Sequence, residues 1–415
     1  MKNELVRKSI IFLITTLFAA INIIPSSSME INKDFIVFTN KQRYSALDFD
    51  QNITDLMKQG GIQSLSACII ENDTVILSKG YGHYNKIPTI EPTNNTVYWV
   101  CSISKTFTAT ALMQLYEKGL FDLDNNVNKY LPFNITNPYY PNVNITFRLL
   151  LSHQSGLYWT TLNDQIKLGA FLYLKLPKSF CFKQYLVPGG IIYQDKVWDN
   201  SKPGEKFHYS DIGFDFLAYL VEIISGKPFD SYCKENIFQP LMMNNTSFNF
   251  KDFPRKNHAN TYVHYKKILF KVPLYNIPYL GSGGLHTTTS DLSHFLIAHM
   301  NGGSYNGVRI LNESTVALMH TVYYPRNITH PNGVYNFQYA LGWSEWNKSG
   351  VVYGGHDGGF FGATAFMRYR IPDKKGVILF TDTFGEFPED TLSQIEELNL
   401  HRKILQEFFN KADEL

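Results

Sequence analysis

Ser102 and Lys105 form an S-x-x-K pattern whose two functional groups could carry out nucleophilic catalysis. A serine hydroxyl is a poor nucleophile until a base takes its proton. Residues three apart on a helix share a face, so the Lys105 amine can reach the Ser102 hydroxyl. The first N–H groups of a helix have no intrahelical partners and carry partial positive charge. The backbone N–H of Ser102 could therefore donate to a developing oxyanion.

The S-x-x-K pattern by itself is a weak signal, because a chain of this length should contain about one or two chance matches. A second copy runs from Ser231 to Lys234 inside a polar segment, whereas Ser102 follows the β-like stretch 97–100 and opens a strongly periodic helix. The alternative interpretation is that Ser102 only caps a helix and Lys105 lies on the surface, since serine is a preferred N-cap residue.

Two segments further along the chain could complete such a site. Tyr209 lies in Y-S-D at 209–211, after P-G-E-K-F at 203–207. A phenol titrates at about pH 10, so Tyr209 could relay a proton only with Lys105 close by. His356 lies in G-H-D-G-G at 355–359, where the glycines would let a substrate approach a strand closely. Taken singly, Tyr209 could be a core aromatic, and the glycine-rich segment a hairpin tip with a surface histidine.

Together these motifs resemble the serine β-lactamase-like and penicillin-binding-protein-like family, which includes class C β-lactamases, D-Ala-D-Ala peptidases, D-aminopeptidases and related esterases. S-I-S-K-T-F at 102–107 is similar to the family's first motif, Y-S-D to its Y-x-N, and G-H-D-G-G to its H-x-G. The segments at 149–157, 283–292 and 339–343 resemble the family's L-L-S-H-T-S-G-L, G-G-L-x-S-T-x-x-D-L and Y-G-L-G-W. The likeness covers roughly residues 45–385, with every landmark in order.

The resemblance implies a role for each matched residue. Ser102 would form the acyl-enzyme, and Lys105 and Tyr209 would share the general base and acid work. His356 would line the pocket. The N–H groups of Ser102 and Gly359 would form the oxyanion hole, with Gly358 beside them. The family likeness therefore predicts a serine hydrolase acting on an amide or ester of a small molecule or peptide, with no cofactor and no metal.

Asp211 departs from the family pattern, which has an asparagine at this position. An amide both donates and accepts hydrogen bonds, whereas a carboxylate only accepts. In the family this asparagine points at the substrate's amide side chain, and an anionic Asp211 near Lys105 would favour the charged lysine and oppose base function. We therefore do not expect efficient β-lactam hydrolysis. The alternative hypothesis is a catalytically weak or inactive binding or assembly protein that keeps the fold.

Hydrophobic periodicity indicates the elements that must position these residues. We expect helices near 47–57, 102–118, 214–224 and 392–411, with Gly119 capping the second, and strands at 62–70, 74–81, 351–353, 363–369 and 376–381. Strands at both chain ends surround a mostly helical region at about 130–280. This order predicts an α+β fold: one antiparallel sheet, built from both chain ends and flanked by helices, with the helical region inserted.

The composition is that of an ordinary globular protein. Apolar residues make up 44% and charged residues 18%, and the formal net charge is +2. No strong electrostatic field favours nucleic acid or an anionic membrane. The absence of G-x-S-x-G, H-E-x-x-H, P-loop and G-x-G-x-x-G motifs argues against an α/β-hydrolase, a zinc protease and a nucleotide-binding protein. The sequence predicts no oligomeric state.

Residues 1–28 have the layout of a secretory signal peptide: a basic start, an apolar run at 10–24 and small residues at 26–28. We expect a catalytic domain at 29–415, secreted or in the lumen of the secretory pathway; the alternative is that 10–24 remains as a membrane anchor. A secreted chain could be glycosylated, and N-x-S/T sequons begin at Asn52, Asn72, Asn94, Asn134, Asn144, Asn244, Asn245, Asn312, Asn327 and Asn347.

Four cysteines occur, without the C-x-x-C spacing of zinc and redox sites, which argues against either kind of site. A disulfide between Cys181 and Cys233 and buried free thiols both remain open, and Cys68 and Cys101 lie in apolar surroundings that favour thiols.

Overall fold

A computed structural model describes residues 46–86, 89–158, 162–265, 268–329, 336–348, 350–387 and 391–415. The predicted signal peptide at 1–28 and the alternative anchor at 10–24 lie outside the described residues, so both stay predictions. Within these ranges no helix combines the length and the apolar character that crossing a bilayer requires.

One eight-stranded antiparallel sheet forms the centre of the fold, in the order β11-β12-β13-β14-β15-β16-β1-β2. Its strands are β1 (Ser64–Glu71), β2 (Thr74–Gly82), β11 (Tyr324–Thr329), β12 (Asn336–Tyr339), β13 (Ser344–Lys348), β14 (Val351–Phe360), β15 (Ala363–Arg370) and β16 (Lys375–Thr381). The N-terminal and C-terminal parts of the chain meet where β1 pairs with β16. The predicted α+β fold, with an antiparallel sheet built from both chain ends, is confirmed.

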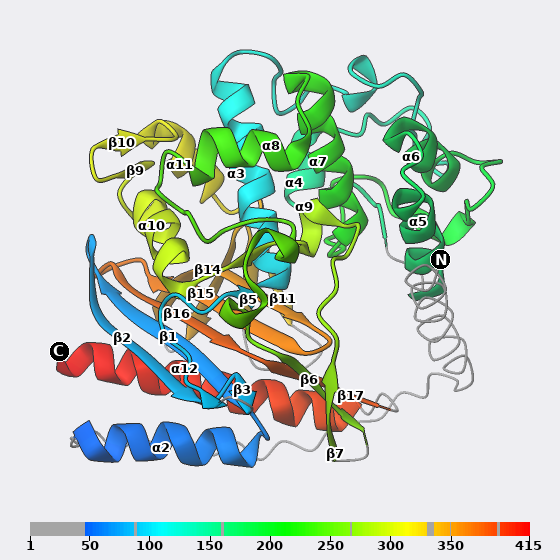
Figure 1. The fold of residues 1–415 in the computed structure, drawn as a ribbon. Helices are drawn as coiled ribbons and strands as arrows, with labels where there is room; N and C mark the ends of the chain where they lie inside the picture. Colours follow the sequence, from blue (N-terminus) through cyan, green and yellow to red (C-terminus); the bar gives the residue numbers. More distant parts are fainter. Residues whose placement is uncertain are drawn as a thin grey trace.

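Helices cover both faces of this sheet (Figure 1). On one face α2 (Ala46–Gln59) packs beside α12 (Thr391–Glu414), and α10 (Thr289–Met300) lies on the other. The region between β2 and β11 also holds α3 (Ser104–Glu117), α4 (Phe147–Leu151), α5 (Leu162–Tyr173), α6 (Lys178–Leu186), α7 (Asp211–Ser225), α8 (Phe229–Cys233), α9 (Leu280–Gly283) and α11 (Glu313–Met319).

Short strands complete the fold. The hairpin of β6 (Thr261–Tyr265) and β7 (Ile268–Val272) joins β17 (Thr383–Phe387) in a three-stranded sheet. Two-stranded pairs are formed by β3 (Asn85–Lys86) with β4 (Thr89–Ile90), β5 (Tyr98–Trp99) with β8 (His286–Thr287), and β9 (Ser304–Tyr305) with β10 (Val308–Arg309). The β5–β8 pair matters for the site, because β5 leads directly into the Ser102 turn.

The central strands are buried on both sides, since a layer of helices covers each face of the sheet. β1, β15 and β16 are buried along almost their whole length. Ala67 and Leu379 belong to one cluster with Ile53 of α2 and Phe408 of α12. Side chains on the opposite face join a larger core that surrounds α3. The sheet is therefore the layer between two hydrophobic cores.

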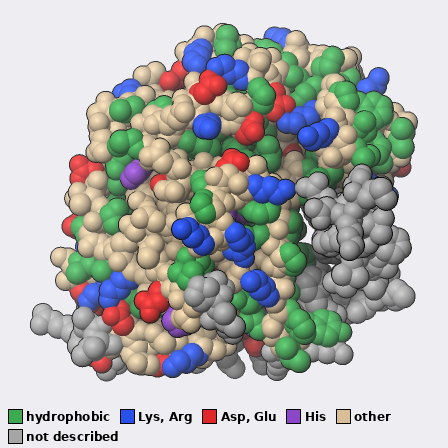
Figure 2. All heavy atoms as spheres, viewed as in Figure 1, with side chains coloured by type: hydrophobic (Ala, Val, Ile, Leu, Met, Phe, Trp, Pro, Cys, Tyr) green, Lys and Arg blue, Asp and Glu red, His purple; other side chains and the backbone are tan. Residues whose placement is uncertain are grey.

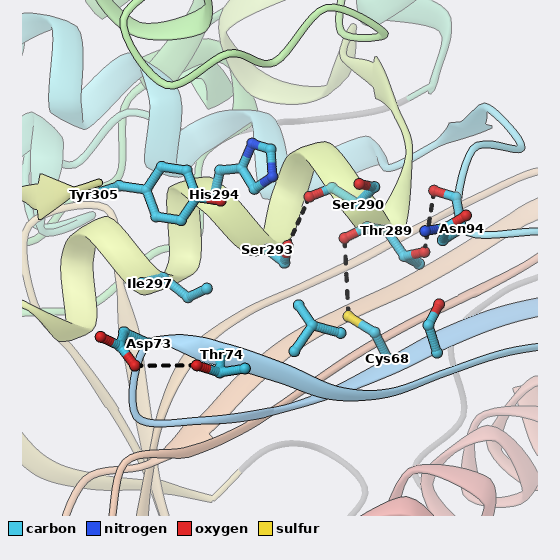
Figure 3. A pocket seen from close by; sticks show the side chains of 12 residues that line it. Cys68, Asp73, Thr74, Asn94, Thr289, Ser290, Ser293, His294, Ile297 and Tyr305 are labelled. Atoms are coloured by element: carbon cyan, nitrogen blue, oxygen red, sulfur yellow. Dashed lines mark hydrogen bonds between the residues drawn. The ribbon is translucent and has the colours of Figure 1, made fainter. Parts of the chain in front are cut away.

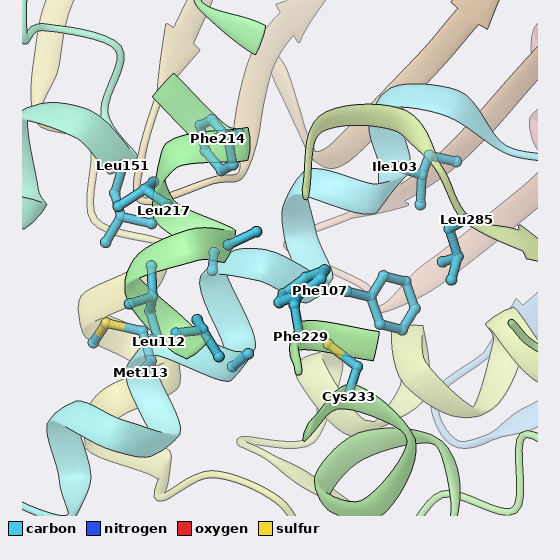
Figure 4. Close-up of a cluster of buried hydrophobic side chains, with 14 of the residues drawn as sticks. Ile103, Phe107, Leu112, Met113, Leu151, Phe214, Leu217, Phe229, Cys233 and Leu285 are labelled. Atoms are coloured by element: carbon cyan, nitrogen blue, oxygen red, sulfur yellow. The ribbon is translucent and has the colours of Figure 1, made fainter. Parts of the chain in front are cut away.

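Helix α3 differs from its expected form. Its apolar residues recur every fourth position, which predicted one buried face, yet every residue from Ser104 to Leu115 is buried. Figure 4 shows Phe107, Leu112 and Met113 of this helix within the hydrophobic cluster. The polar side chains are tolerated because they are bonded: Thr110 donates to the Thr106 carbonyl and Thr108 to the Gly281 carbonyl. The helix ends as predicted before Gly119, which has φ +69°.

All four cysteines are buried free thiols. The disulfide suggested between Cys181 and Cys233 is therefore wrong, and the alternative of buried thiols is correct. Burial raises the pKa of the Cys68 thiol to about 12, so it stays protonated and unreactive at neutral pH.

The surface carries both signs of charge. Figure 2 shows acidic and basic side chains on the same face, in keeping with the net charge of +2. Several sequon asparagines are exposed, namely Asn72, Asn94, Asn134, Asn144, Asn244, Asn312 and Asn347. Asn327 lies where no side chain is described. Glycosylation stays a prediction.

Candidate active site

Ser102 lies on a tight turn between β5 and α3. Residues Cys101–Ile103 form a single 3₁₀ turn, and α3 begins two residues after Ser102. Cys101 has φ +48°, in a left-handed region that residues other than glycine seldom adopt. Cys101 and Ile103 are buried, while Ser102 is partly exposed. The turn therefore holds both neighbours in the core and leaves the serine open to an incoming molecule.

Lys105 is fully buried and has three hydrogen-bonding partners. Its Nζ lies 3.0 Å from Ser102 Oγ, 2.8 Å from the carbonyl oxygen of Ser282 and 2.5 Å from Asp211 Oδ1. An ammonium group has three protons to donate, so the three acceptors match it. The predicted proximity of Lys105 to Ser102 is thus present, and Asp211 also contacts the amine.

Tyr209 lies against the same amine. Lys105 Nζ is 4.8 Å from the centroid of the Tyr209 ring. Burial is the main cause that raises the pKa of Tyr209 well above its usual range, and the Asp211 and Asp357 carboxylates raise it further, while a hydrogen bond with the Ser102 side chain lowers it. The phenol therefore keeps its proton at neutral pH and is available as a donor beside Ser102.

Asp211 is the first residue of α7, and Asp215 lies one turn further on. Asp215 is buried and accepts hydrogen bonds from the backbone N–H of Ser282, at 3.0 Å, and from its hydroxyl, at 2.9 Å. Burial, followed by the nearby Asp211 carboxylate, raises the pKa of Asp215 to about 7. Since the Ser282 carbonyl accepts from Lys105, Asp215 holds one of the three acceptors in place. Sequence reasoning missed Asp215 and Ser282, and no local motif marks them.

His153 connects two of the motifs. Its Nδ1 accepts from the backbone N–H of Ser210 at 2.9 Å, and its ring lies 4.5 Å from that of Tyr209. The backbone N–H of His208 donates to the His153 carbonyl. Burial lowers the pKa of His153 well below its usual range, so the imidazole is neutral. The segment at 149–157, whose likeness to the family was noted without a role, thus fixes the turn that carries Tyr209.

His356 is buried beside these groups, and both its nitrogens are engaged. Its Nε2 lies 2.9 Å from the Tyr339 hydroxyl, and its Nδ1 lies 2.6 Å from the Asp357 carbonyl. The carbonyl can only accept, so Nδ1 carries the proton and Nε2 accepts from Tyr339. Burial is the main cause that lowers the pKa of His356 to about 3, with Lys105 and Arg368 adding to it. The histidine is neutral and anchors Tyr339, rather than presenting a charge to the site.

Gly358 packs directly against the Ser102 turn. A Cβ atom at this position would lie 2.2 Å from the Val100 carbonyl oxygen and 3.0 Å from the Ser102 nitrogen. A Cβ at Gly359 would make only an ordinary contact, 3.5 Å from Phe384. Close approach of β14 to Ser102 therefore requires glycine at 358, whereas 359 has room for a side chain.

The second S-x-x-K copy shows a different environment. Ser231 in α8 bonds to Asp230, and Lys234 is exposed. No cluster of His, Cys, Asp and Glu able to hold a metal ion occurs in the described part of the chain.

A cavity of about 310 Å³ lies elsewhere, between the β1–β2 hairpin and α10. Figure 3 shows Cys68 and Thr289 among its lining residues. The candidate site residues do not line it.

The fold and the site together define the β-lactamase and transpeptidase class: an antiparallel sheet flanked by helices, with a Ser-x-x-Lys pair where the central helix begins. The Beta-lactamase family model matches residues 49–399, and the chain therefore belongs to this family.

The individual relatives share only a low sequence identity with this chain. The chain is 29% identical to the putative penicillin-binding protein PbpX of Bacillus subtilis over 273 residues, which cover 64% of this chain and 62% of that protein. It spans less than two thirds of the length of the curated relatives that it matches first.

Among solved structures, the octameric penicillin-binding protein homologue from Pyrococcus abyssi has a TM-score of 0.68 at 24% identity, covering 87% of this chain and 78% of that one. A D-amino acid amidase from Ochrobactrum anthropi has a TM-score of 0.66 at 19% identity, covering 88% and 99%. At these identities the likeness shows the fold alone.

Proposed function

We propose that the protein is a serine hydrolase that cleaves an amide or ester through an acyl-enzyme on Ser102. The observation that supports this most directly is the 3.0 Å contact between Ser102 Oγ and Lys105 Nζ. The Tyr209 phenol adjoins the same hydroxyl. Its relatives include a D-amino acid amidase and a putative penicillin-binding protein, which agrees with acyl transfer.

The contacts of Lys105 suggest how the serine is activated. When the amine is neutral, its two N–H groups can still donate hydrogen bonds to the Ser282 carbonyl and to Asp211. Its lone pair then points at Ser102. Ser102 Oγ attacks the carbonyl carbon as its proton passes to Lys105. The N–H groups of Ser102 and Gly359 would stabilise the oxyanion. Lys105 and Tyr209 would return the proton to the leaving amine or alcohol, and water would hydrolyse the acyl-enzyme in a second round.

A fluorophosphonate probe tests this assignment, because it labels an activated serine. We expect labelling of the wild-type protein, loss of labelling in Ser102→Ala, and full labelling in Ser231→Ala, which alters the serine of the second S-x-x-K copy. Labelling that survives Ser102→Ala would contradict the choice of nucleophile.

The 2.5 Å contact between Lys105 and Asp211 favours a second candidate, a binding protein that has kept the fold and lost turnover. A folded wild-type protein that takes up neither fluorophosphonate, ester, amide nor β-lactam would establish this alternative.

A further inference from the structure

Charges at the candidate site are arranged so that carboxylates lie in front of buried cations. The Lys105 side chain has no exposed surface, whereas that of its partner Asp211 is 34% exposed. The Arg368 side chain is 1% exposed, whereas that of its partner Asp357, at 2.6 Å, is 30% exposed. Both carboxylates lie near enough to Tyr209 to act on its phenol. In both ion pairs the negative member is therefore the one that an approaching molecule can contact.

His356 on β14 and Arg368 on β15 also present no free positive charge to the site. His356 lies beside Tyr209. Here the imidazole is buried and neutral, with Nδ1 on the Asp357 carbonyl and Nε2 on the Tyr339 hydroxyl. Arg368 is committed to Asp357 and to the carbonyl and hydroxyl of Ser344. Neither residue is placed to bind a carboxylate of a substrate.

We infer that the substrate carries a protonated amine close to the scissile bond, and that the Asp211 carboxylate binds it. This inference rests on the proposed hydrolase function. A carboxylate offers about four acceptor positions on its two oxygens, and the Lys105 contact uses one of them, on Oδ1. The exposed part of Asp211 can therefore accept from a second ammonium group. Asparagine at this position would lack the charge.

Binding an amine at Asp211 also bears on catalysis. A second cation beside Lys105 disfavours the charged form of the lysine. The bound substrate amine would then compensate the charge of Asp211, which otherwise stabilises the ammonium form of Lys105. This would favour the neutral Lys105 amine that must take the Ser102 proton. The amine would act as a recognition element and as an aid to base formation, so its removal should lower kcat as well as raise KM.

A charge series of substrates tests the inference. Alanine 4-nitroanilide, N-acetylalanine 4-nitroanilide and N-succinylalanine 4-nitroanilide share one leaving group and place a cation, a neutral amide or an anion at the same point; both enantiomers are used, at pH 6.5. We expect kcat/KM to favour the free amine over the acetyl compound by roughly 10- to 100-fold, the range of a charge-assisted hydrogen bond, with the succinyl compound poorest.

Two variants sharpen the result. Asp211→Asn should abolish the preference for the amine, while Asp230→Asn, which removes the same charge from the exposed α8 surface, should leave it unchanged. Equal rates for amine and acetyl substrates in the wild type would overturn the inference and leave the proposed function intact. Failure of every compound in the series would overturn the inference alone if the fluorophosphonate probe still labels Ser102, and the proposed function as well if the folded protein also takes up no fluorophosphonate, ester or β-lactam.

Discussion

Lys105 illustrates how a few contacts set the chemistry of a residue. Two of its three partners, Asp211 and the Ser282 carbonyl, only accept hydrogen bonds from the amine, so they orient it toward the third, Ser102. The same geometry serves an ammonium that donates to Ser102 and a neutral amine that accepts from it. The protonation state, rather than the position, separates the resting from the reactive form.

Asp215 is the residue whose titration should be visible in the rate. Its pKa is raised to about 7, mainly by burial. Above that pH the carboxylate adds negative charge near Lys105, which favours the ammonium form and should depress kcat/KM. We expect the wild-type profile to contain an inflection near pH 7 that is absent in Asp215→Asn, a variant that can still bond to Ser282.

A second substitution separates positioning from charge at Asp215. Asp215→Ala removes both hydrogen bonds to Ser282, so its carbonyl loses its support, and we expect kcat to fall by about 10-fold or more. Melting temperatures of both variants control for misfolding. An inflection near pH 7 that persists in Asp215→Asn would show that another group titrates there.

At the scale of elements, the close approach of β14 to the Ser102 turn is the critical contact. In Gly358→Ala the new Cβ would lie 2.2 Å from the Val100 carbonyl oxygen, so the strand or the turn must move. Displacements of about 1 Å at a reacting centre can cost on the order of 100-fold in rate. We expect a loss of that size in kcat for Gly358→Ala.

Gly359→Ala is the matched comparison on the same strand. Its Cβ would meet Phe384 at 3.5 Å, an ordinary contact, and its backbone N–H is kept. We expect a much smaller loss of kcat in steady-state measurements with one ester substrate. Equal losses in the two variants would mean that the packing of β14 on the turn does not control the rate.

The elements also show what a sequence can reveal. Five strands of the central sheet (β1, β2, β14, β15 and β16), the bounding helices and the grouping of Ser102, Lys105 and Tyr209 followed from periodicity and ordered motifs, whereas β11, β12 and β13 were not predicted. The contact of Asp215 with Ser282 joins residues 67 positions apart, and no spacing rule predicts it. Burial of α3 on every side was missed for a related reason: Thr108 is satisfied by Gly281, which comes 173 residues later. Local patterns do not contain such contacts.

For the whole molecule, buried histidines with a lowered pKa make folding stability depend on pH. Burial lowers the pKa to about 4 for His258, His320 and His401 and to about 3 for His286 and His356. A histidine in the unfolded chain titrates near its ordinary value of 6.5. As the pH falls from about 6.5 towards 4, the unfolded chain takes up these protons and the folded chain does not, so folding stability is lost.

Carboxyls whose pKa is raised by burial act in the opposite direction; among the described residues they are Asp215, Asp291, Glu345, Asp382 and Glu407. Burial raises the pKa of Asp215 and of Asp382 to about 7, from an ordinary value of 3.8. Between these values the folded chain holds protons that the unfolded chain has released, so acidification favours folding at these two positions. Among the described residues seven histidines have a lowered pKa and five carboxyls a raised one, so we expect the unfolded chain to bind more protons at pH 5 and acid to be destabilising overall.

We therefore expect the melting temperature to fall steadily as the pH is lowered from 7 to 5, measured by thermal unfolding at constant ionic strength. His320→Gln replaces a fully buried imidazole with a side chain that does not titrate, so it should flatten this dependence even if it lowers stability at pH 7. His83→Gln, at an exposed position, should leave the slope unchanged. A melting temperature that stays constant or rises between pH 7 and pH 5 would mean that the carboxyls with raised pKa, and not the histidines, determine the pH dependence.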